Sequence, residues 1–329
     1  MLPPHFLIAR PLCMLEAMPE TVDTRSPAPA GRVRLTDVER TFPTKDGLRT
    51  VLQHVTLDVS AGEIIAIVGP SGCGKSTLLR LIGGLDSPTA GSITLDDEEV
   101  RAHDDSTAIA FQEPRLLPWR TIAQNVALGL PRGTRGRAAR ERVSELLELV
   151  GLTHAADQRP REVSGGMAQR ASLARALARS PRVLLLDEPF GALDALTRLK
   201  MHDLLLDIHR SQPTTVVLVT HDVEEALYLA DHVLMLRNLH AEPSEPERPR
   251  AKIVALGSSS GLGALGSAPA HEPAVEEASE APRANGSVGR FVTVPGARPR
   301  DRGARTFTDL RTSLLEGLGV HKLTTKETA

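Results

Sequence analysis

The chain has 329 residues, of which 41% are hydrophobic and 24% are charged, so it is long enough to bury a sizeable core. Its net charge of -2 gives no electrostatic reason to expect a nucleic-acid partner, and none is predicted. No run of about 18 apolar residues is present, so the sequence predicts no helical membrane span. The two cysteines are too few for a disulfide framework and fit a reducing compartment.

Residues 1–31 are rich in Pro and Ala and are predicted to be a disordered leader. Prolines and charged residues interrupt the apolar part of this stretch, which therefore lacks the continuous run of a signal peptide. A start of translation at Met14 or Met18 is an alternative interpretation.

Short strands are predicted to follow the leader. The run Ile64–Val68 is too short for a helix and is typical of a strand that is buried on both faces. A Gly-rich turn then leads into a helix. The predicted elements of this part are strands at 33–42, 50–59, Ile64–Val68, 92–95 and 108–111, the last two as a pair, and a helix over 75–85.

Helices are predicted to predominate between residues 121 and 180. In 137–150 the residues Val143, Leu146 and Leu147 recur at helical spacing, with charged residues on the other face. Elsewhere strands and helices alternate, which predicts a mostly parallel sheet covered on both faces and interrupted by this helical insertion. The remaining predicted elements are helices at 164–179, 195–210 and 223–230, and strands at 183–186, 215–219 and 233–236.

The stretch 241–290 differs in composition from the rest of the chain. Pro, Gly, Ala, Ser and Glu dominate it and it has no aromatic residue, so it cannot bury enough apolar area to offset the entropy of ordering. Because long loops close at little extra cost, strands 233–236 and 291–294 are still expected to be antiparallel neighbours. The predicted organisation is a disordered leader 1–31, a main domain 32–239, a disordered insert 240–290, a C-terminal strand and helix 291–320 with the helix over 308–318, and a tail 321–329.

The segment GPSGCGKST fits the phosphate-loop pattern G-x-x-x-x-G-K-[ST] and stands between a buried strand and a helix, a context that argues against a chance match. Gly72 and Gly74 let backbone N–H groups close on phosphate oxygens at a helix N-terminus. Lys75 is predicted to reach the β- and γ-phosphates of ATP, and the Ser76 hydroxyl to bind Mg²⁺. The predicted phosphate-binding residues are Gly69, Pro70, Ser71, Gly72, Cys73, Gly74, Lys75, Ser76 and Thr77.

The segment VLLLDEP supplies a second element of the same site. Its apolar residues form a buried strand, and Asp187 at the carboxyl end of that strand is predicted to hold Mg²⁺ or its water. Glu188 follows and is predicted to polarise the attacking water as a general base. An ordinary acidic strand end is the alternative. Together with the phosphate loop, the segment predicts an α/β P-loop NTPase.

The segment VSGGMAQR, followed by ASLARALARSPRVLLLDEP, resembles the signature region of the ABC ATPase family, usually written LSGGQ. The resemblance implies a RecA-like core with an antiparallel β subdomain and an inserted helical subdomain that carries the signature. It also implies a head-to-tail homodimer, in which Ser164, Gly165 and Gly166 of one subunit contact the nucleotide held by the other. Val163 and Met167 depart from the Leu and Gln of the family pattern, and a hydrogen bond made by that Gln would be lost.

Further residues match the family in order along the chain. Gln112 matches the glutamine that senses Mg²⁺ and water and links to the membrane subunit, and Asp194 matches a loop that crosses the dimer interface. His221 in VLVTHD matches the histidine that contacts the γ-phosphate. Phe42 matches the aromatic residue on which adenine stacks, although a side chain of the strand core is the alternative.

Within the family, FQEPRLLPWRTIAQNVALGL and LDEPFGALDALTRLKMHDLLLDIH resemble the importers of nitrate, sulfonates and taurine, most of all those of aliphatic sulfonates. The resemblance implies ATP and Mg²⁺ as ligands and a peripheral location on the cytoplasmic face of the inner membrane. It implies two integral-membrane permease subunits and a periplasmic or lipid-anchored substrate-binding protein as partners. Residues 114–119 are interpreted as an apolar groove for a permease helix, with internal packing as the alternative.

Two other functions remain as alternatives. One is an ABC ATPase of DNA repair or translation, which generally has two cassettes or a long coiled coil, and this chain has one cassette and no heptad run. The other is a switch that binds ATP without hydrolysing it, against which the acidic residue Glu188 and the histidine His221 both argue.

Overall fold

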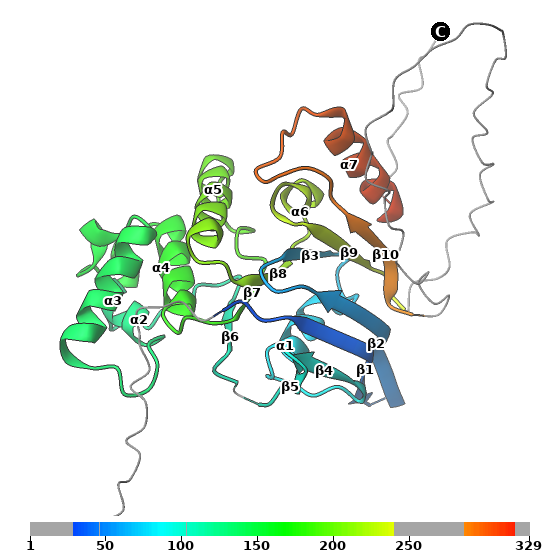
Figure 1. Cartoon of the computed structure of the whole chain (residues 1–329), viewed down its shortest axis with the longest axis horizontal. Coiled ribbons are helices and arrows are strands. Elements are labelled where there is room, and N and C mark those ends of the chain that lie inside the picture. Colours follow the sequence, from blue (N-terminus) through cyan, green and yellow to red (C-terminus); the bar gives the residue numbers. More distant parts are fainter. Residues whose placement is uncertain (1–28, 46, 103, 240–285, 320–329) are drawn as a thin grey trace, which may run out of the picture.

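The computed structural model describes residues 29–45, 47–102, 104–239 and 286–319, drawn in colour in Figure 1. The leader up to residue 28, most of the predicted insert and the tail lie outside the described residues. Two sheets are present in the described part, one of four strands in the order β2-β1-β4-β5 and one of six in the order β10-β9-β3-β8-β7-β6. The strands are β1 Val33–Thr44, β2 Gly47–Val59, β3 Ile64–Val68, β4 Ala90–Leu95, β5 Glu98–Glu99, β6 Thr107–Ala110, β7 Val183–Asp187, β8 Thr215–Val219, β9 His232–Leu236 and β10 Val288–Thr293.

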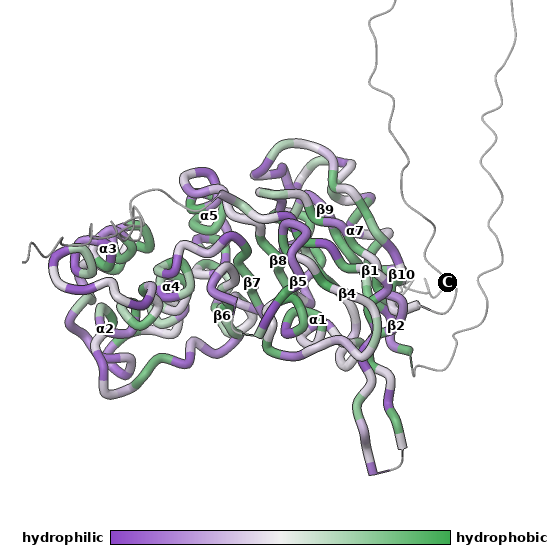
Figure 2. Tube along the Cα trace, turned by 60° about the horizontal axis from the view of Figure 1, so that its bottom comes forward, coloured by the Kyte–Doolittle hydropathy of each residue, from purple (hydrophilic) through white to green (hydrophobic). Residues whose placement is uncertain are grey.

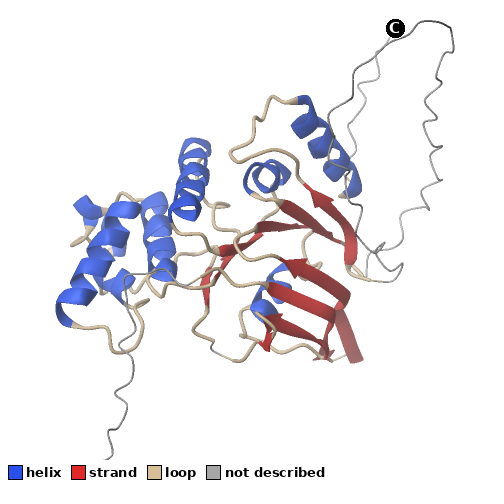
Figure 3. Ribbon diagram, viewed as in Figure 1, coloured by secondary structure: helices blue, strands red, loops and turns tan. Residues whose placement is uncertain are grey.

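The helices gather mainly on the opposite side of the molecule from the four-stranded sheet, as Figure 3 shows. The predicted helical insertion is confirmed as α2, α3 and α4 with two short 3-10 turns between them. In α3 the apolar residues Val143, Leu146 and Leu147 are buried, as the spacing predicted. The helices are α1 Lys75–Ile82, α2 Ile122–Ala127, α3 Gly136–Leu149, α4 Gly165–Leu177, α5 Ala195–Ser211, α6 Val223–Leu229 and α7 Arg305–Gly317.

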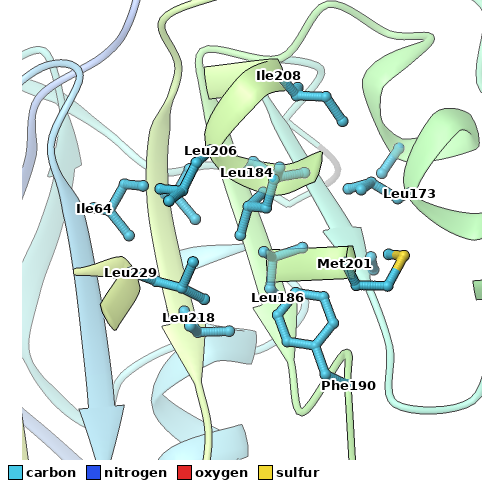
Figure 4. Close-up of a cluster of buried hydrophobic side chains, with 14 of the residues drawn as sticks. Ile64, Leu173, Leu184, Leu186, Phe190, Met201, Leu206, Ile208, Leu218 and Leu229 are labelled. Atoms are coloured by element: carbon cyan, nitrogen blue, oxygen red, sulfur yellow. The ribbon is translucent and has the colours of Figure 1, made fainter. Parts of the chain in front are cut away.

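The six-stranded sheet is parallel except for β10, and its central strands are buried on both faces. Alternate residues of β3 therefore face different cores: Ile64 packs on one side and Ile65 on the other. Figure 4 shows the first core, in which Leu184 and Leu218 of the sheet meet Leu206 of α5. Burial on both faces explains why these strands read as unbroken apolar runs.

The four-stranded sheet is antiparallel, and one prediction about its strands was wrong. Residues 92–95 and 108–111 were expected to pair with each other. Instead β4 pairs with β1 and β5, while β6 pairs with β7 in the parallel sheet. β4 buries alternate residues, which suits an antiparallel sheet with one outer face, and closeness along the chain does not by itself impose pairing.

The predicted antiparallel pairing across the insert is confirmed. Phe291 of β10 lies opposite Leu234 of β9, and Val292 opposite Val233. β10 begins at Val288, a few residues before the predicted restart of the fold at residue 291. The C-terminal segment thus completes the edge of the parallel sheet and continues into α7, which packs beside α6.

This arrangement is the fold class that the sequence predicted: an α/β, RecA-like P-loop NTPase core with an antiparallel β subdomain and an inserted helical subdomain. Both core clusters include strands of the parallel sheet, so the sheet joins the subdomains into one packed body. No helix within the described ranges is long and apolar enough to cross a membrane.

Candidate functional site

The phosphate loop connects β3 to α1 at the carboxyl edge of the parallel sheet. Gly72 and Gly74 have φ angles of 79° and 102°, a left-handed region that other residues adopt at a cost. A Cβ atom on Gly74 would lie 2.7 Å from the Leu52 Cδ2 atom of β2. The turn therefore requires glycine there both for its conformation and for the close approach of the antiparallel sheet.

Lys75 is the first residue of α1, and it is only 8% exposed. Its Nζ donates hydrogen bonds to the carbonyl oxygens of Gly69 at 2.8 Å and Pro70 at 3.1 Å. These bonds hold the ammonium group inside the curve of the loop, next to a helix N-terminus, so both features favour an anion there. Burial raises the pKa of the neighbouring Cys73 thiol, which keeps this thiol neutral and favours a packing role for it.

Ser76 and Asp187 meet across the site although they lie far apart in the sequence. The Ser76 hydroxyl donates a 3.0 Å hydrogen bond to Asp187 Oδ1 at the end of β7. Burial raises the pKa of Asp187, with a further contribution from the charge of Glu188, while the Ser76 hydrogen bond acts in the opposite direction. A hydroxyl and a buried carboxylate are oxygen ligands of the kind Mg²⁺ prefers, so the donor set fits that ion.

Glu188 leaves the end of β7 in a left-handed conformation, with φ of 46°. Its backbone N–H donates to the Val219 carbonyl at 2.9 Å, which fixes this turn against β8. Its Oε2 atom lies 3.5 Å from Nδ1 of His221, whose side chain is 63% exposed. The strained backbone, which costs on the order of 1 kcal/mol, thus accompanies a carboxylate that faces the end of the neighbouring strand.

Gln112 also reaches this group. A Cβ atom built on Gly191 would lie 3.6 Å from Gln112 Nε2 and 3.8 Å from Glu188 Oε2, so both side chains border the same point. The residues predicted from separate motifs as Mg²⁺ ligands, base and γ-phosphate contact therefore follow the carboxyl ends of β3, β6, β7 and β8.

The signature residues form the start of a different helix, α4. Ser164 caps this helix by accepting a hydrogen bond from the Met167 N–H at 3.3 Å. Ser164 and Gly165 are exposed, whereas a Cβ on Gly166 would lie 2.6 Å from Thr197 Cγ2 of α5. Figure 1 places α4 in the helical subdomain and α1 between the two sheets, so the signature and the phosphate loop occupy different parts of the chain.

Asp194 stands beside the signature rather than at the phosphate loop. It caps α5 by accepting a 3.0 Å hydrogen bond from the Thr197 N–H. Hydrogen bonding by the Thr197 side chain, and to a lesser degree by its N–H, lowers the pKa of the Asp194 carboxyl group. Thr197 thus touches both Gly166 and Asp194, and it ties the signature to the loop before α5.

Phe42 lies on the β1–β2 hairpin, whose end extends away from the body of the molecule in Figure 2. Its ring is half-buried and carries the Arg40 guanidinium at 4.4 Å from the ring centroid. Arg40 pairs with Leu52, the residue that borders Gly74, and Phe42 lies two residues further toward the end of the hairpin.

A groove of about 630 Å³ lies where the parallel sheet meets the helical subdomain. Residues 114–119, interpreted as an apolar groove for a permease helix, are not among its lining residues, and that interpretation stays a prediction. Leu116 is partly buried against the core and Trp119 is 69% exposed. The groove lining includes Leu85, Phe111, Leu128, Pro131, Arg175 and Arg179.

Sequence reasoning missed Arg175, which belongs to this groove. Its guanidinium donates to the carbonyl oxygens of Pro114 at 2.7 Å and Arg115 at 2.9 Å, and so ties the segment after Gln112 to the signature helix α4. The helical spacing of α4 indicated only a core face, and no local signal identified carbonyl partners about 60 residues away.

The comparison with family models finds that residues 52–191 match the model described as ABC transporter. The aliphatic sulfonates import ATP-binding protein SsuB of Albidiferax ferrireducens is 52% identical over 204 residues, which cover 62% of this chain and 70% of that protein. The protein of the same name from Bacillus subtilis is 47% identical over 199 residues, which cover 60% of this chain and 77% of the relative.

Solved structures give the same family likeness. The ATP-binding cassette MJ0796, in a dimeric post-hydrolysis state bound to ADP and Pi, is 34% identical with a TM-score of 0.57, and the match covers 63% of this chain and 96% of that one. The cbiO1 protein from Clostridium perfringens, part of the ABC transporter complex cbiONQ, is 26% identical with a TM-score of 0.57, over 63% of this chain and 86% of that one.

Proposed function

This chain belongs to the ABC transporter family of ATP-binding proteins, and we propose that it hydrolyses ATP to drive the import of aliphatic sulfonates. The observation that carries the ATPase part is the meeting of Lys75, Asp187, Glu188 and His221 at one edge of the parallel sheet. The sulfonate part is supported by the names of the relatives, which are up to 52% identical to this chain.

The reaction begins with ATP in the phosphate loop, where backbone N–H groups and the Lys75 ammonium hold the β- and γ-phosphates. Ser76, Asp187 and Gln112 are the residues that would hold Mg²⁺, which when bound neutralises phosphate charge and offsets the buried charge of Asp187. The raised pKa of Asp187 supports this assignment, because the carboxylate is costly to keep charged until a cation is near it.

Glu188 then acts on water. Its carboxylate accepts a proton from the water molecule whose oxygen attacks the γ-phosphorus, while the bond from that phosphorus to the β–γ bridging oxygen breaks and ADP leaves. His221, which lies 3.5 Å from Glu188 Oε2, is placed to contact the γ-phosphate. Electrostatic stabilisation by Lys75 and His221 carries most of the rate enhancement.

A second subunit supplies the remaining contacts. Ser164 and Gly165 are exposed at the N-terminus of α4, in a different part of the chain from the phosphate loop. In a head-to-tail homodimer they would meet the γ-phosphate held by the partner, with Asp194 at the same interface. Phe42, on the hairpin whose Leu52 borders Gly74, would stack with adenine.

The complete importer would add two membrane permeases and a periplasmic or lipid-anchored substrate-binding protein, with this subunit on the cytoplasmic face of the inner membrane. The groove lined by Phe111 and Leu128 suits a short permease helix, since its lining is partly apolar. Arg175 would pass movement of the segment after Gln112 to the signature helix.

The substrate is tested by uptake. The chain and its genomic neighbouring permease and binding protein are expressed in a bacterium that lacks its own sulfonate, taurine and nitrate importers. Ethanesulfonate uptake that requires ATP hydrolysis is expected, with taurine and nitrate uptake much slower. Uptake of nitrate or taurine instead would reassign the substrate, and ethanesulfonate uptake without ATP turnover would favour a non-hydrolytic switch.

A further inference from the structure

A buried polar cluster lies behind the two catalytic loops, on the side of α5 and α6. Its centre is His202 of α5, which is 3% exposed, and Glu225 of α6, which is 5% exposed. Imidazole and carboxylate groups are rarely buried to this extent unless neighbouring groups hold them. No residue of this cluster belongs to the nucleotide site described above, although Thr220 and Phe190, which touch it, are near neighbours of that site in the sequence.

Arg302 determines which atoms of the cluster donate hydrogen bonds and which accept them. Its guanidinium lies 3.2 Å from His202 Nδ1 and has no acceptor, so Nδ1 accepts and the ring proton sits on Nε2. Nε2 lies 3.5 Å from Glu225 Oε1. Within the described part of the chain both atoms are buried and neither makes a hydrogen bond, so the polar neighbour of each is the other atom at 3.5 Å.

Glu225 connects the cluster to the loop that carries His221. Its Oε2 accepts a 2.6 Å hydrogen bond from the Thr220 hydroxyl, which itself accepts one from the Asp222 N–H at 3.0 Å. The backbone N–H of Thr220 donates to Ile67 in β3 at 3.1 Å. Both residues that flank His221 are therefore held by one hydroxyl, and Glu225 sets the direction in which this hydroxyl points.

The same imidazole also contacts the other catalytic loop. The ring of Phe190, two residues after Glu188, meets the His202 ring edge to face at 5.0 Å between centroids. His202 thus lies between the loop of Glu188 and the loop of His221, whose side chains are 3.5 Å apart in the site. A shift of the imidazole would reach both loops.

Arg302 comes from the C-terminal segment, in the loop between β10 and α7 that arches over α6 in Figure 1. Its guanidinium stacks 4.3 Å from the centroid of the Tyr228 ring. Two residues earlier, buried Arg300 donates to the carbonyl oxygens of Leu227 and Val294, which fixes the loop against α6. Arg302 therefore reaches His202 from a firmly held backbone.

We propose that Arg302 is a positioning residue for ATP hydrolysis, which acts through His202, Glu225 and Thr220 to hold His221 against Glu188. The C-terminal segment thereby helps to position the catalytic side chains, although it contacts no nucleotide. This inference rests on the proposed ATPase function and adds residues that none of the nucleotide-binding motifs contains.

The test uses the full chain with three substitutions and one control. Arg302→Gln removes the charged donor, Arg302→Lys keeps a donor, and Glu225→Gln keeps the size of the side chain but presents an amide N–H₂ to either Thr220 or His202. The control is Arg311→Gln, which breaks the 2.5 Å contact of α7 with Glu224 on the same helix α6 but leaves the cluster intact. Steady-state ATPase assays give kcat and KM for each protein.

We expect Arg302→Gln and Glu225→Gln to lower kcat about tenfold while KM for ATP changes less than twofold, because nucleotide binding does not use the cluster. Arg302→Lys should recover part of the rate, and Arg311→Gln should match the wild type. In a His221→Ala background Arg302→Gln should have no further effect. Wild-type kcat in both cluster variants, equal losses in the control, or additive losses with His221→Ala would each overturn the proposal. If Arg302→Gln does not fold, the isosteric Glu225→Gln decides.

A second readout does not depend on activity. Nitrogen-15 spectra of histidine-labelled protein should show His202 in the Nε2–H form, assigned by its loss in His202→Gln, and Arg302→Gln should shift its Nδ1 signal. A wild-type chain that does not hydrolyse ATP would contradict the proposed function. An Nδ1–H tautomer of His202 would contradict only the contact between Arg302 and His202.

Discussion

Two helix N-termini of this molecule have the character of anion sites, and they are built in different ways. The first turn of α1 follows a glycine loop and carries buried Lys75, whose ammonium is held by carbonyl groups of the same loop. The first turn of α4 follows Ser164. This residue is exposed, and its hydroxyl oxygen caps its own helix. One site brings its own buried cation, and the other presents an exposed helix start at Ser164 and Gly165.

The two helix N-termini are therefore expected to contribute to different steps. At α1 the cation and the Ser76–Asp187 contact are assembled by one chain, so nucleotide affinity should be a property of the single subunit. At α4 only Ser164 and Gly165 are exposed and Gly166 is buried, so we expect a contribution of this helix only when another subunit brings a phosphate to it. Substitutions at the N-termini of α1 and α4 should therefore impair different measured properties of the protein.

The largest effect is expected at the acidic residue beside α1. Glu188→Gln removes the base but not the phosphate contacts, so turnover should fall by a factor of about 1,000 or more while ATP binding persists and an ATP-bound dimer accumulates. Phosphate release and size-exclusion chromatography with ATP measure the two results. Glu98→Gln, at an exposed position on β5, serves as the control. Near wild-type turnover in Glu188→Gln would show that another group accepts the proton.

Lys75→Ala is expected to act on binding instead. Loss of the buried ammonium should weaken ATP affinity about a hundredfold, since the phosphate charge would lose its main partner in the chain. Titration with a fluorescent ATP analogue measures the affinity at a protein concentration where the wild type is monomeric. Lys200→Ala removes the same charge from an exposed place on α5 and should bind normally. Unchanged affinity in Lys75→Ala would refute the assigned role.

Ser164→Ala tests the α4 end, with a smaller expected effect. Loss of the cap destabilises the first turn by about 1 kcal/mol. The ATPase rate should fall, while the affinity of the monomer for ATP stays as in the wild type. Thr121→Ala is a matched control, because Thr121 caps α2 of the same subdomain in the same way. If Ser164→Ala weakened nucleotide binding by the monomer, the division between the two helix ends would be wrong.

Met167→Gln should have the smallest effect. The Met167 N–H already caps through Ser164, and its half-buried side chain packs against the core, so restoring the family residue should change the ATPase rate by no more than about threefold. A rise of about a hundredfold would mean that the departure from the family pattern had crippled the signature.

Much of this architecture was predictable from short stretches of sequence. The run Ile64–Val68, the turn with Gly72 and Gly74, and the apolar spacing in α3 each depend on residues that are close together in the chain. Their preferences come from backbone sterics and one-sided or two-sided burial, which act over a few residues. The strand pairing across residues 240–285 was also predictable, because the segments 233–236 and 291–294 are both predicted as strands and a long loop closes at little cost.

Other features were decided only by tertiary structure. The sequence by itself predicted a nucleotide site with Ser76, Asp187, Glu188 and His221, because each stands in a recognisable local motif. The 3.5 Å approach of Glu188 to His221, the partner of β4, and the contact of Arg302 with His202 came from packing. Those contacts join residues from separate elements, and their energies depend on which surfaces the whole sheet brings together rather than on any preference of the local chain.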